Sequence, residues 1–159
     1  MHMITDLIAS DSCFAPLRAP SRRAVLQILG QSLTRSAQKL GCAIGKNDIY
    51  ESFLERDLLG PTGIGDGVAI PHARVPLLTH PLGAVAVLDA PIDFGSPDRV
   101  GCDIVLALVS PAASGGEHLR ALARLARVAR DPGMRDKLRK AQSRDMLISA
   151  LDLSQTIAA

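Results

Sequence analysis

The chain has 159 residues, a formal net charge of +2, 47% apolar residues and 3% aromatic residues. This length predicts one domain, because domains most often hold about 100 to 150 residues. Proteins that read single-stranded nucleic acids stack bases on several aromatic side chains, and this chain has one tyrosine, three phenylalanines and no tryptophan. The composition therefore excludes that class of partner, and the small net charge gives no reason to expect a nucleic acid.

The cysteines and the apolar runs indicate where the protein works. Cys13, Cys42 and Cys102 are odd in number and far apart, so they form neither a disulfide framework nor a paired-cysteine zinc site. The longest apolar run, residues 104–109, is far below the roughly 18 residues that cross a bilayer. We expect a cytoplasmic protein that does not insert into a membrane and has no metal site.

Two amphipathic helices are predicted in the first part of the chain. Ser21 can cap a helix over residues 22–40, in which apolar residues recur at helical spacing. Asn47 can cap a second helix over residues 48–59, which Gly60-Pro61 ends.

Short strands are predicted after these helices. The glycine-rich residues 60–67 lead into an apolar run at 68–70, and Pro71 is expected to end it. Residues 84–88 and 103–109 are rich in Val, Ile and Leu, which predicts strands that are buried on both faces of a sheet.

The C-terminal third is predicted to be helical. Ser114 and Glu117 have the spacing of a capping box, Asp131-Pro132 can open a second helix, and Ser143 can open a third. The apolar face of the first of these helices is predicted to contain Leu119, Leu122, Leu125, Ala126 and Ala129.

Helices at both ends with strands between them predict an α/β fold, with three α/β/α layers around a central mixed sheet. We expect a single domain over residues 1–159, with its core at about 4–152. No composition shift or linker divides the chain.

Residues 62–72, with the sequence TGIGDGVAIPH, are the first candidate for chemistry. Glycines at alternating positions allow positive φ angles and expose backbone N–H groups that can bind an anion. A proline that ends the strand would leave His72 at its rim, and imidazole is a nitrogen nucleophile that is partly neutral near pH 7. The alternative is a glycine-rich turn with an incidental surface histidine.

His118 is the second candidate, because the predicted capping box puts it in the first turn of a helix. The positive end of the helix dipole disfavours imidazolium there and attracts anions such as a phosphoryl group. The alternative is a histidine on the helix surface. His80, in a loop, is assigned no role.

Four segments together resemble a known family. These are Arg56, the TGIGDGVAIPH segment, PIDF at 91–94 and EHL at 117–119. The chain resembles the enzyme IIA (EIIA) domains of the fructose/mannitol class of the bacterial phosphoenolpyruvate:sugar phosphotransferase system. Within that class it is most similar to the nitrogen-regulatory branch, over about residues 4–151. The resemblance implies a mannitol-specific enzyme IIA-like fold.

The resemblance also implies roles for individual residues. His72 would accept a phosphoryl group, as a tele-phosphohistidine, from the phosphohistidine of an HPr/NPr-like carrier, while its other ring nitrogen donates to a backbone carbonyl. Arg56 and His118 would stabilise the phosphate, although Arg56 could instead be a surface ion-pair partner of Asp57 or Glu55. No cofactor is implied. The expected phosphate cradle consists of Thr62, Gly63, Gly65 and Gly67. Pro61, where relatives commonly carry a serine, is a departure from the family pattern.

Three functions remain open from the sequence. The favoured one is a regulatory phosphoprotein that binds target proteins according to its phosphorylation state. The resemblance suggests potassium transport systems, sensor kinases and stringent-response enzymes as targets. A sugar-transport EIIA would pass the phosphoryl group to a IIB cysteine instead. A binding module without phosphotransfer is the third reading.

Overall fold

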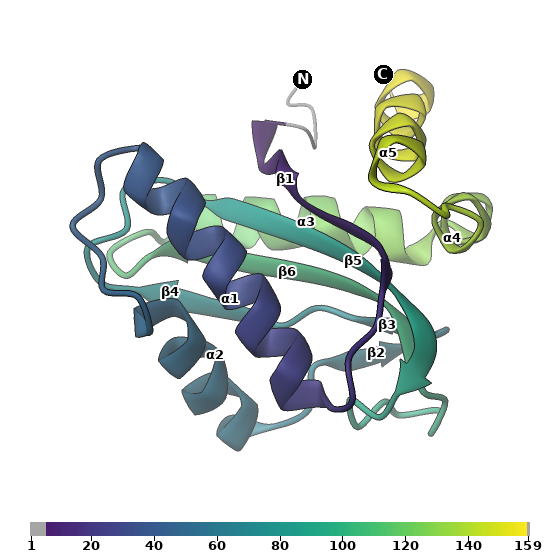
Figure 1. Cartoon of the computed structure of the whole chain (residues 1–159), viewed down its shortest axis with the longest axis horizontal. Coiled ribbons are helices and arrows are strands. Elements are labelled where there is room, and N and C mark those ends of the chain that lie inside the picture. Colours follow the sequence, from purple (N-terminus) through teal and green to yellow (C-terminus); the bar gives the residue numbers. More distant parts are fainter. Residues whose placement is uncertain (1–5, 159) are drawn as a thin grey trace.

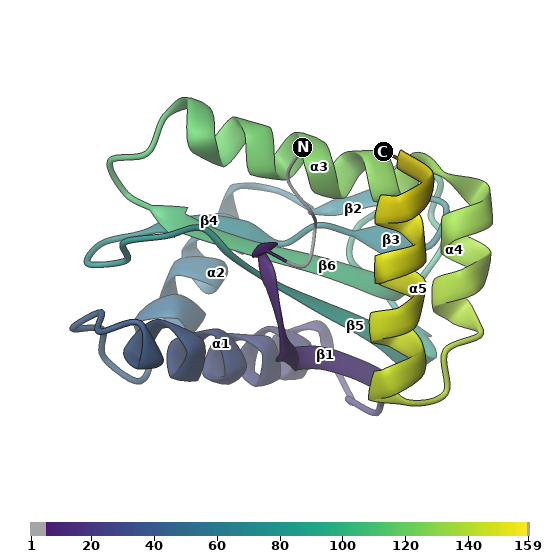
Figure 2. The same ribbon diagram turned by 90° about the horizontal axis from the view of Figure 1, so that it is seen from above.

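A mixed six-stranded sheet lies between two layers of helices (Figure 2). The computed structural model describes the backbone of residues 6–158 and the side chains of residues 6–152. The predicted three-layer α/β/α architecture is confirmed (Figure 1). In chain order the elements are β1 (Ile8–Leu17), α1 (Arg22–Lys39), α2 (Asp48–Leu59), β2 (Gly63–Gly65), β3 (Val68–Ala69), β4 (His72–Val75), β5 (Leu82–Ile92), β6 (Cys102–Pro111), α3 (Gly116–Arg130), α4 (Pro132–Arg139) and α5 (Arg144–Ala158).

The sheet is built around β6. Its order is β1-β5-β6-β3-β2, and β4 also pairs with β6. β3 and β4 both run parallel to β6, with Val68 opposite Ile104 and His72 opposite Leu108. This register is the same in both pairs, so β3 and β4 are two segments of one strand path along β6. The prediction that Pro71 ends the strand was therefore incomplete: pairing lapses at the proline and resumes at once.

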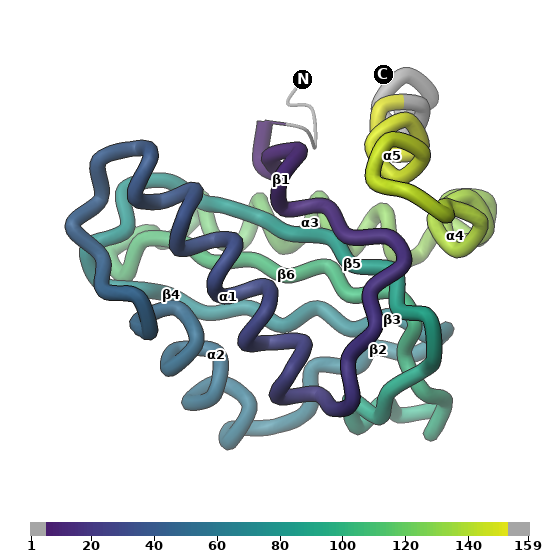
Figure 3. The backbone as a smooth tube through the Cα atoms, in the orientation of Figure 1, coloured from purple at the N-terminus to yellow at the C-terminus, as the bar shows by residue number. Residues whose placement is uncertain are grey.

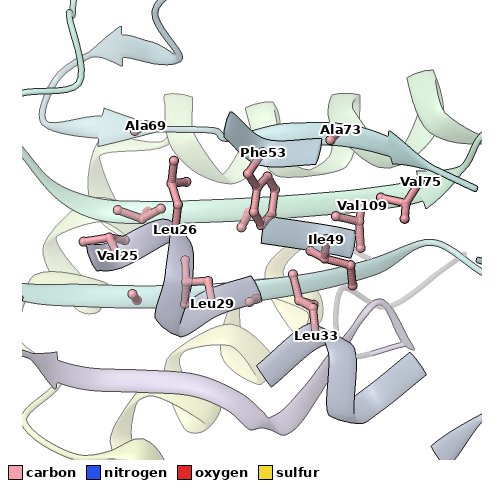
Figure 4. Packing of buried hydrophobic residues seen from close by; sticks show 14 of the residues in the cluster. Val25, Leu26, Leu29, Leu33, Ile49, Phe53, Ala69, Ala73, Val75 and Val109 are labelled. Atoms are coloured by element: carbon pink, nitrogen blue, oxygen red, sulfur yellow. The ribbon is translucent and has the colours of Figure 1, made fainter. Parts of the chain in front are cut away.

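Side chains of β6 alternate between two apolar cores. Ile104 and Leu106 face the layer of α3, α4 and α5, whereas Val105 and Ala107 face α1 and α2. All four are fully buried, which confirms the predicted strand with two buried faces. Figure 4 shows the second core, where side chains from both helices pack on the sheet, among them Leu26, Leu29, Leu33, Ile49 and Phe53.

Most predicted helix starts are confirmed by their caps. The side chains of Ser21, Asp131 and Ser143 each accept a hydrogen bond from a backbone amide two or three residues further along. Asn47 makes no such bond, and its backbone is helical, whereas an N-cap residue is usually extended. The adjacent Asp48 carboxylate accepts from the amide of Gly45 in the preceding loop.

The start of α3 differs from the prediction. The helix begins at Gly116, and the Ser114 hydroxyl donates to the carbonyl of Pro111, so no capping box forms. Leu119 was expected on the apolar face but is 63% exposed. His118 packs inward instead, and the next residue is rotated by about 100° around a helix of 3.6 residues per turn. The buried face contains His118, Ala121, Leu125, Val128 and Ala129.

β1 was not predicted, so the expectation of helices at both ends was wrong at the N-terminus. This strand runs parallel to β5 at one edge of the sheet (Figure 3). Its register with β5 shifts twice, and its burial does not alternate. Irregular pairing removes the period-2 hydrophobic pattern from which a strand is predicted.

Candidate functional site

The β4 strand directs His72 toward the α3 layer. Ala73 and Val75 belong to the core under α1 and α2. Side chains alternate along a strand, so His72 and Arg74 project from the opposite face. His72 is half-buried there, at the first position of β4.

A backbone carbonyl orients the His72 ring. Nδ1 lies 2.8 Å from the carbonyl oxygen of Ile70. A carbonyl only accepts, so Nδ1 carries the proton and Nε2 keeps its lone pair. The expected bond to a backbone carbonyl is thus present. Burial lowers the pKa of His72, and the charge of Arg56 lowers it further, although the Ile70 bond acts in the other direction. The neutral form of the ring therefore predominates at pH 7.

His118 reaches the same place from the adjacent helix layer. It is the third residue of α3, and its ring centroid is 5.9 Å from that of His72, with the planes tilted by 43°. Its side chain is buried, so the alternative of a helix-surface histidine is wrong. Nδ1 lies 2.7 Å from Oγ of Ser110. Burial is the largest cause that lowers the pKa of His118, and the charges of Arg74 and His72 lower it further.

The first turn of α3, which contains His118, has backbone amides that no side chain caps. Its N-cap is Gly115, and no side chain caps the helix there. Unpaired amides at a helix N-terminus, together with the helix dipole, attract anions. A negatively charged group on His72 would therefore lie near both an imidazole and a helix N-terminus.

Arg56 contributes a positive charge from α2. This helix packs along β4 at the edge of the sheet (Figure 1). The Nη1 atom of Arg56 donates to the carbonyl of Gly60 at 2.9 Å, and its charge acts on the pKa of His72. Asp57, one of the alternative partners, pairs with Arg22 at 3.2 Å instead.

Two of the expected cradle residues, Thr62 and Gly63, lie where the loop enters β2, beside β3. The carbonyl of buried Thr62 accepts from the amide of Ile70 at 2.9 Å, so Thr62 is adjacent to the segment that orients His72. Gly63 donates to the carbonyl of Phe94, and a Cβ on it would collide with the Ser96 side chain. Gly63 is therefore needed for close packing of the loop.

The other two expected cradle residues lie elsewhere. Gly65 and Gly67 have φ angles of 102° and 77° in the turn that joins β2 to β3. His72 lies five residue steps after Gly67 along an extended path, which is about 16 Å at 3.3 Å per step. The guanidinium of Arg139 lies against this turn instead. Gly67 is close to His72 in sequence but not in space, because the chain between them runs straight along β6. The positive φ angles of Gly65 and Gly67 allow the turn between β2 and β3.

The sequence reasoning missed two residues of the site. Arg74 and Ser110 are register partners on β4 and β6, and both influence His118. The signals were available. Arg74 follows His72 at strand spacing, and Ser110 is the polar residue that ends the apolar run of β6.

Comparison with protein families identifies the chain's relatives. Residues 6–153 match the model of the phosphoenolpyruvate-dependent sugar phosphotransferase system, EIIA 2. The chain belongs to this EIIA family. The nitrogen regulatory protein of Bradyrhizobium diazoefficiens is 39% identical over 98% of this chain and 99% of that protein. The 2-O-alpha-mannosyl-D-glycerate-specific EIIABC component of Escherichia coli is 31% identical over 96% of this chain but only 23% of that longer protein.

Solved structures agree with this membership. The nitrogen regulatory protein IIA-Ntr from Neisseria meningitidis matches with a TM-score of 0.83 and 26% identity, over 93% of this chain and 98% of that one. The chain is therefore an EIIA that most resembles the nitrogen-regulatory branch, as the sequence motifs indicated. EIIA proteins in general take part in phosphotransfer with carrier proteins.

No helix within residues 6–158 is long and apolar enough to cross a membrane. In the same part of the chain, no three His, Cys, Asp or Glu side chains are grouped so that they could hold a metal ion.

Proposed function

We propose that the chain accepts a phosphoryl group on Nε2 of His72 from the phosphohistidine of an HPr/NPr-like carrier. The hydrogen bond from Nδ1 to the Ile70 carbonyl is the observation that carries this proposal. It assigns the proton to Nδ1 and leaves the lone pair of Nε2 as the nucleophile.

The transfer needs no net proton movement. The lone pair of Nε2 forms a bond to phosphorus while the N–P bond of the donor breaks, and the donor nitrogen keeps that electron pair. Each ring retains the proton on its other nitrogen throughout. Positioning and compensation of oxygen charge are then the main tasks of the protein.

The surrounding groups suit these tasks. Arg56 supplies a permanent positive charge, and His118 with the first turn of α3 supplies N–H donors on the other side. Thr62 and Gly63 support the adjoining loop. We exclude Gly67 from the cradle because of its distance from His72, and Gly65 because it pairs with Val68 at the same turn.

We further propose that phosphorylation switches binding to target proteins in the cytoplasm. The phosphoryl group adds up to about two negative charges to a surface that now holds neutral rings. The 39% identity to a nitrogen regulatory protein over nearly the full length favours this role. Potassium transport systems, sensor kinases and stringent-response enzymes are the target classes that we would test first.

A sugar-transport role is the second candidate. The 31% identity to one part of a sugar-specific EIIABC component favours it. In that role His72 would pass the phosphoryl group to a IIB cysteine.

Phosphotransfer is tested by incubating the chain with phosphoenolpyruvate, enzyme I and an HPr-like carrier, followed by intact mass measurement. We expect one phosphoryl group that is lost in acid and retained in base. His72→Ala should remain unlabelled, whereas the control His80→Ala should be labelled as fully as the wild type. Full labelling of His72→Ala would contradict the assignment, and no labelling of the wild type would favour the non-catalytic binding module.

The two roles are separated by offering the phosphorylated chain to purified IIB domains and to candidate targets. Rapid transfer to a IIB cysteine supports sugar transport. Binding to a target that differs between phosphorylated and unphosphorylated chains, without transfer, supports regulation.

A further inference from the structure

The two site histidines have different hydrogen-bond partners on Nδ1. For His72 the partner is the carbonyl oxygen of Ile70, which can only accept. For His118 it is the hydroxyl of Ser110, 2.7 Å away, which can donate or accept. The two rings can therefore adopt different tautomers.

Burial decides the direction of the second bond. Ser110 is fully buried and His118 is 5% exposed. If the hydroxyl donates to Nδ1, its proton and the ring's lone pair are both satisfied. If Nδ1 donated instead, the buried hydroxyl proton would need another acceptor, and a buried donor without an acceptor is unfavourable.

The direction of this bond determines what His118 presents to its neighbour. With the hydroxyl as donor, the neutral ring carries its proton on Nε2, which can then donate to a phosphoryl oxygen. With the opposite tautomer, Nε2 would present a lone pair to oxygens that are themselves negative. Burial lowers the pKa of His118, so a second ring proton does not remove this distinction near pH 7.

We propose that Ser110 is a positioning residue that holds His118 as the Nε2–H tautomer, opposite to that of His72, so that His118 donates to the phosphoryl group on His72. The catalytic part rests on the proposed function, since it needs a phosphoryl group on His72. The tautomer part concerns the resting protein alone. The hydrogen bond joins the sheet to the adjacent helix layer, because Ser110 lies near the end of β6 and His118 lies in the first turn of α3.

A matched pair of variants tests this role. Ser110→Thr keeps the hydroxyl, and Ser110→Val replaces it with a methyl group in a side chain of similar shape. Ser114→Ala controls for loss of a nearby serine hydroxyl, because Ser114 donates to the Pro111 carbonyl and not to a histidine. Thermal melting of each variant reports whether it folds.

The tautomers are read from ¹⁵N chemical shifts and ¹H–¹⁵N couplings of the histidine rings above pH 8. In the wild type we expect a protonated Nδ1 on His72 and a protonated Nε2 on His118. Ser110→Val should move the His118 Nδ1 shift and raise the pKa of His118, because the neutral ring loses a donor. Ser110→Thr and Ser114→Ala should leave both unchanged. A wild-type His118 with its proton on Nδ1 would overturn the proposal without any variant.

The phosphorylation rate tests the catalytic consequence. Loss of one neutral hydrogen bond predicts a rate lower by roughly 3- to 10-fold in Ser110→Val, and Ser110→Thr should restore it. Equal rates and equal ring shifts in the Thr and Val variants would refute a positioning role. If the wild type takes no phosphoryl group, the proposed function fails, while the ring spectra still decide the role of Ser110 in holding the tautomer.

Discussion

The rings of His72 and His118 lie 5.9 Å apart, although one belongs to a strand and the other to a helix in a different layer. Neither element alone makes the site. Each ring is held through its Nδ1 atom, by Ile70 in one case and by Ser110 in the other. Both Nε2 atoms thereby remain available for phosphoryl chemistry.

Replacement of His118 should slow phosphorylation without abolishing it. Removal of one preorganised donor to a developing charge costs on the order of 10²-fold in rate, and we expect this for His118→Ala. His118→Gln should keep much of the rate, because its amide can still donate. Rapid-quench measurement of phosphate transfer from the carrier tests both variants. An unchanged rate in His118→Ala would show that this ring does not contact the phosphoryl group.

Arg56 should control both the rate and its pH dependence. The neutral His72 ring is the nucleophile, so the rate should fall as pH drops through a pKa that lies below 6.5. Arg56→Ala removes a nearby positive charge, so the midpoint should move to higher pH and the maximal rate should fall. Rate profiles between pH 5 and 8 measure both effects. Arg18→Ala, at an exposed arginine paired with Asp89, is the control and should change neither.

The same histidines should make the fold sensitive to mild acid. Both pKa values are lower in the folded chain than the ordinary value of 6.5, so the unfolded chain binds more protons below that pH. The free energy of unfolding should be level above about pH 7 and decrease as pH falls below 6.5. Urea unfolding at pH 7.5 and pH 5.5 measures the difference. The double variant His72→Gln/His118→Gln should lose less stability than the wild type between these two pH values. An equal loss would show that other groups cause the sensitivity to acid.

The inward face of α3 can be tested with two leucines. Leu125 is fully buried and Leu119 is 63% exposed. Leu125→Ala should lower the free energy of unfolding by about 2–5 kcal/mol, whereas Leu119→Ala should change it by less than about 0.5 kcal/mol. Chemical denaturation of both variants measures this. Equal losses would mean that the helix packs as the sequence alone suggested.

The turn between β2 and β3 should affect stability and not phosphotransfer. Arg139 donates to the Asp103 carboxylate at 3.0 Å and to the carbonyl of Asp66 within that turn. Arg139→Ala should therefore destabilise the chain modestly, by roughly 1 kcal/mol at this partly exposed site. Its phosphorylation rate should equal that of the wild type. A strong loss of rate in a folded variant would indicate that Gly65 and Gly67 do belong to the phosphate site.

The features that depend on local chemistry could be predicted from the sequence alone. Continuous apolar residues in β6, the caps at Ser21 and Asp131 and the motif around His72 could all be recognised because neighbours in sequence carry the signal. The family resemblance followed from the same short segments.

The contacts between residues that are distant in sequence could not be predicted in this way. Strand pairing put Gly67 far from His72, and layer packing put Ser110 beneath His118, because an extended chain separates near neighbours while a sheet and a helix bring distant residues together. The irregular strand β1 could not be predicted from the sequence for a related reason. Its place depends on pairing with β5, which leaves no regular hydrophobic period in the strand itself.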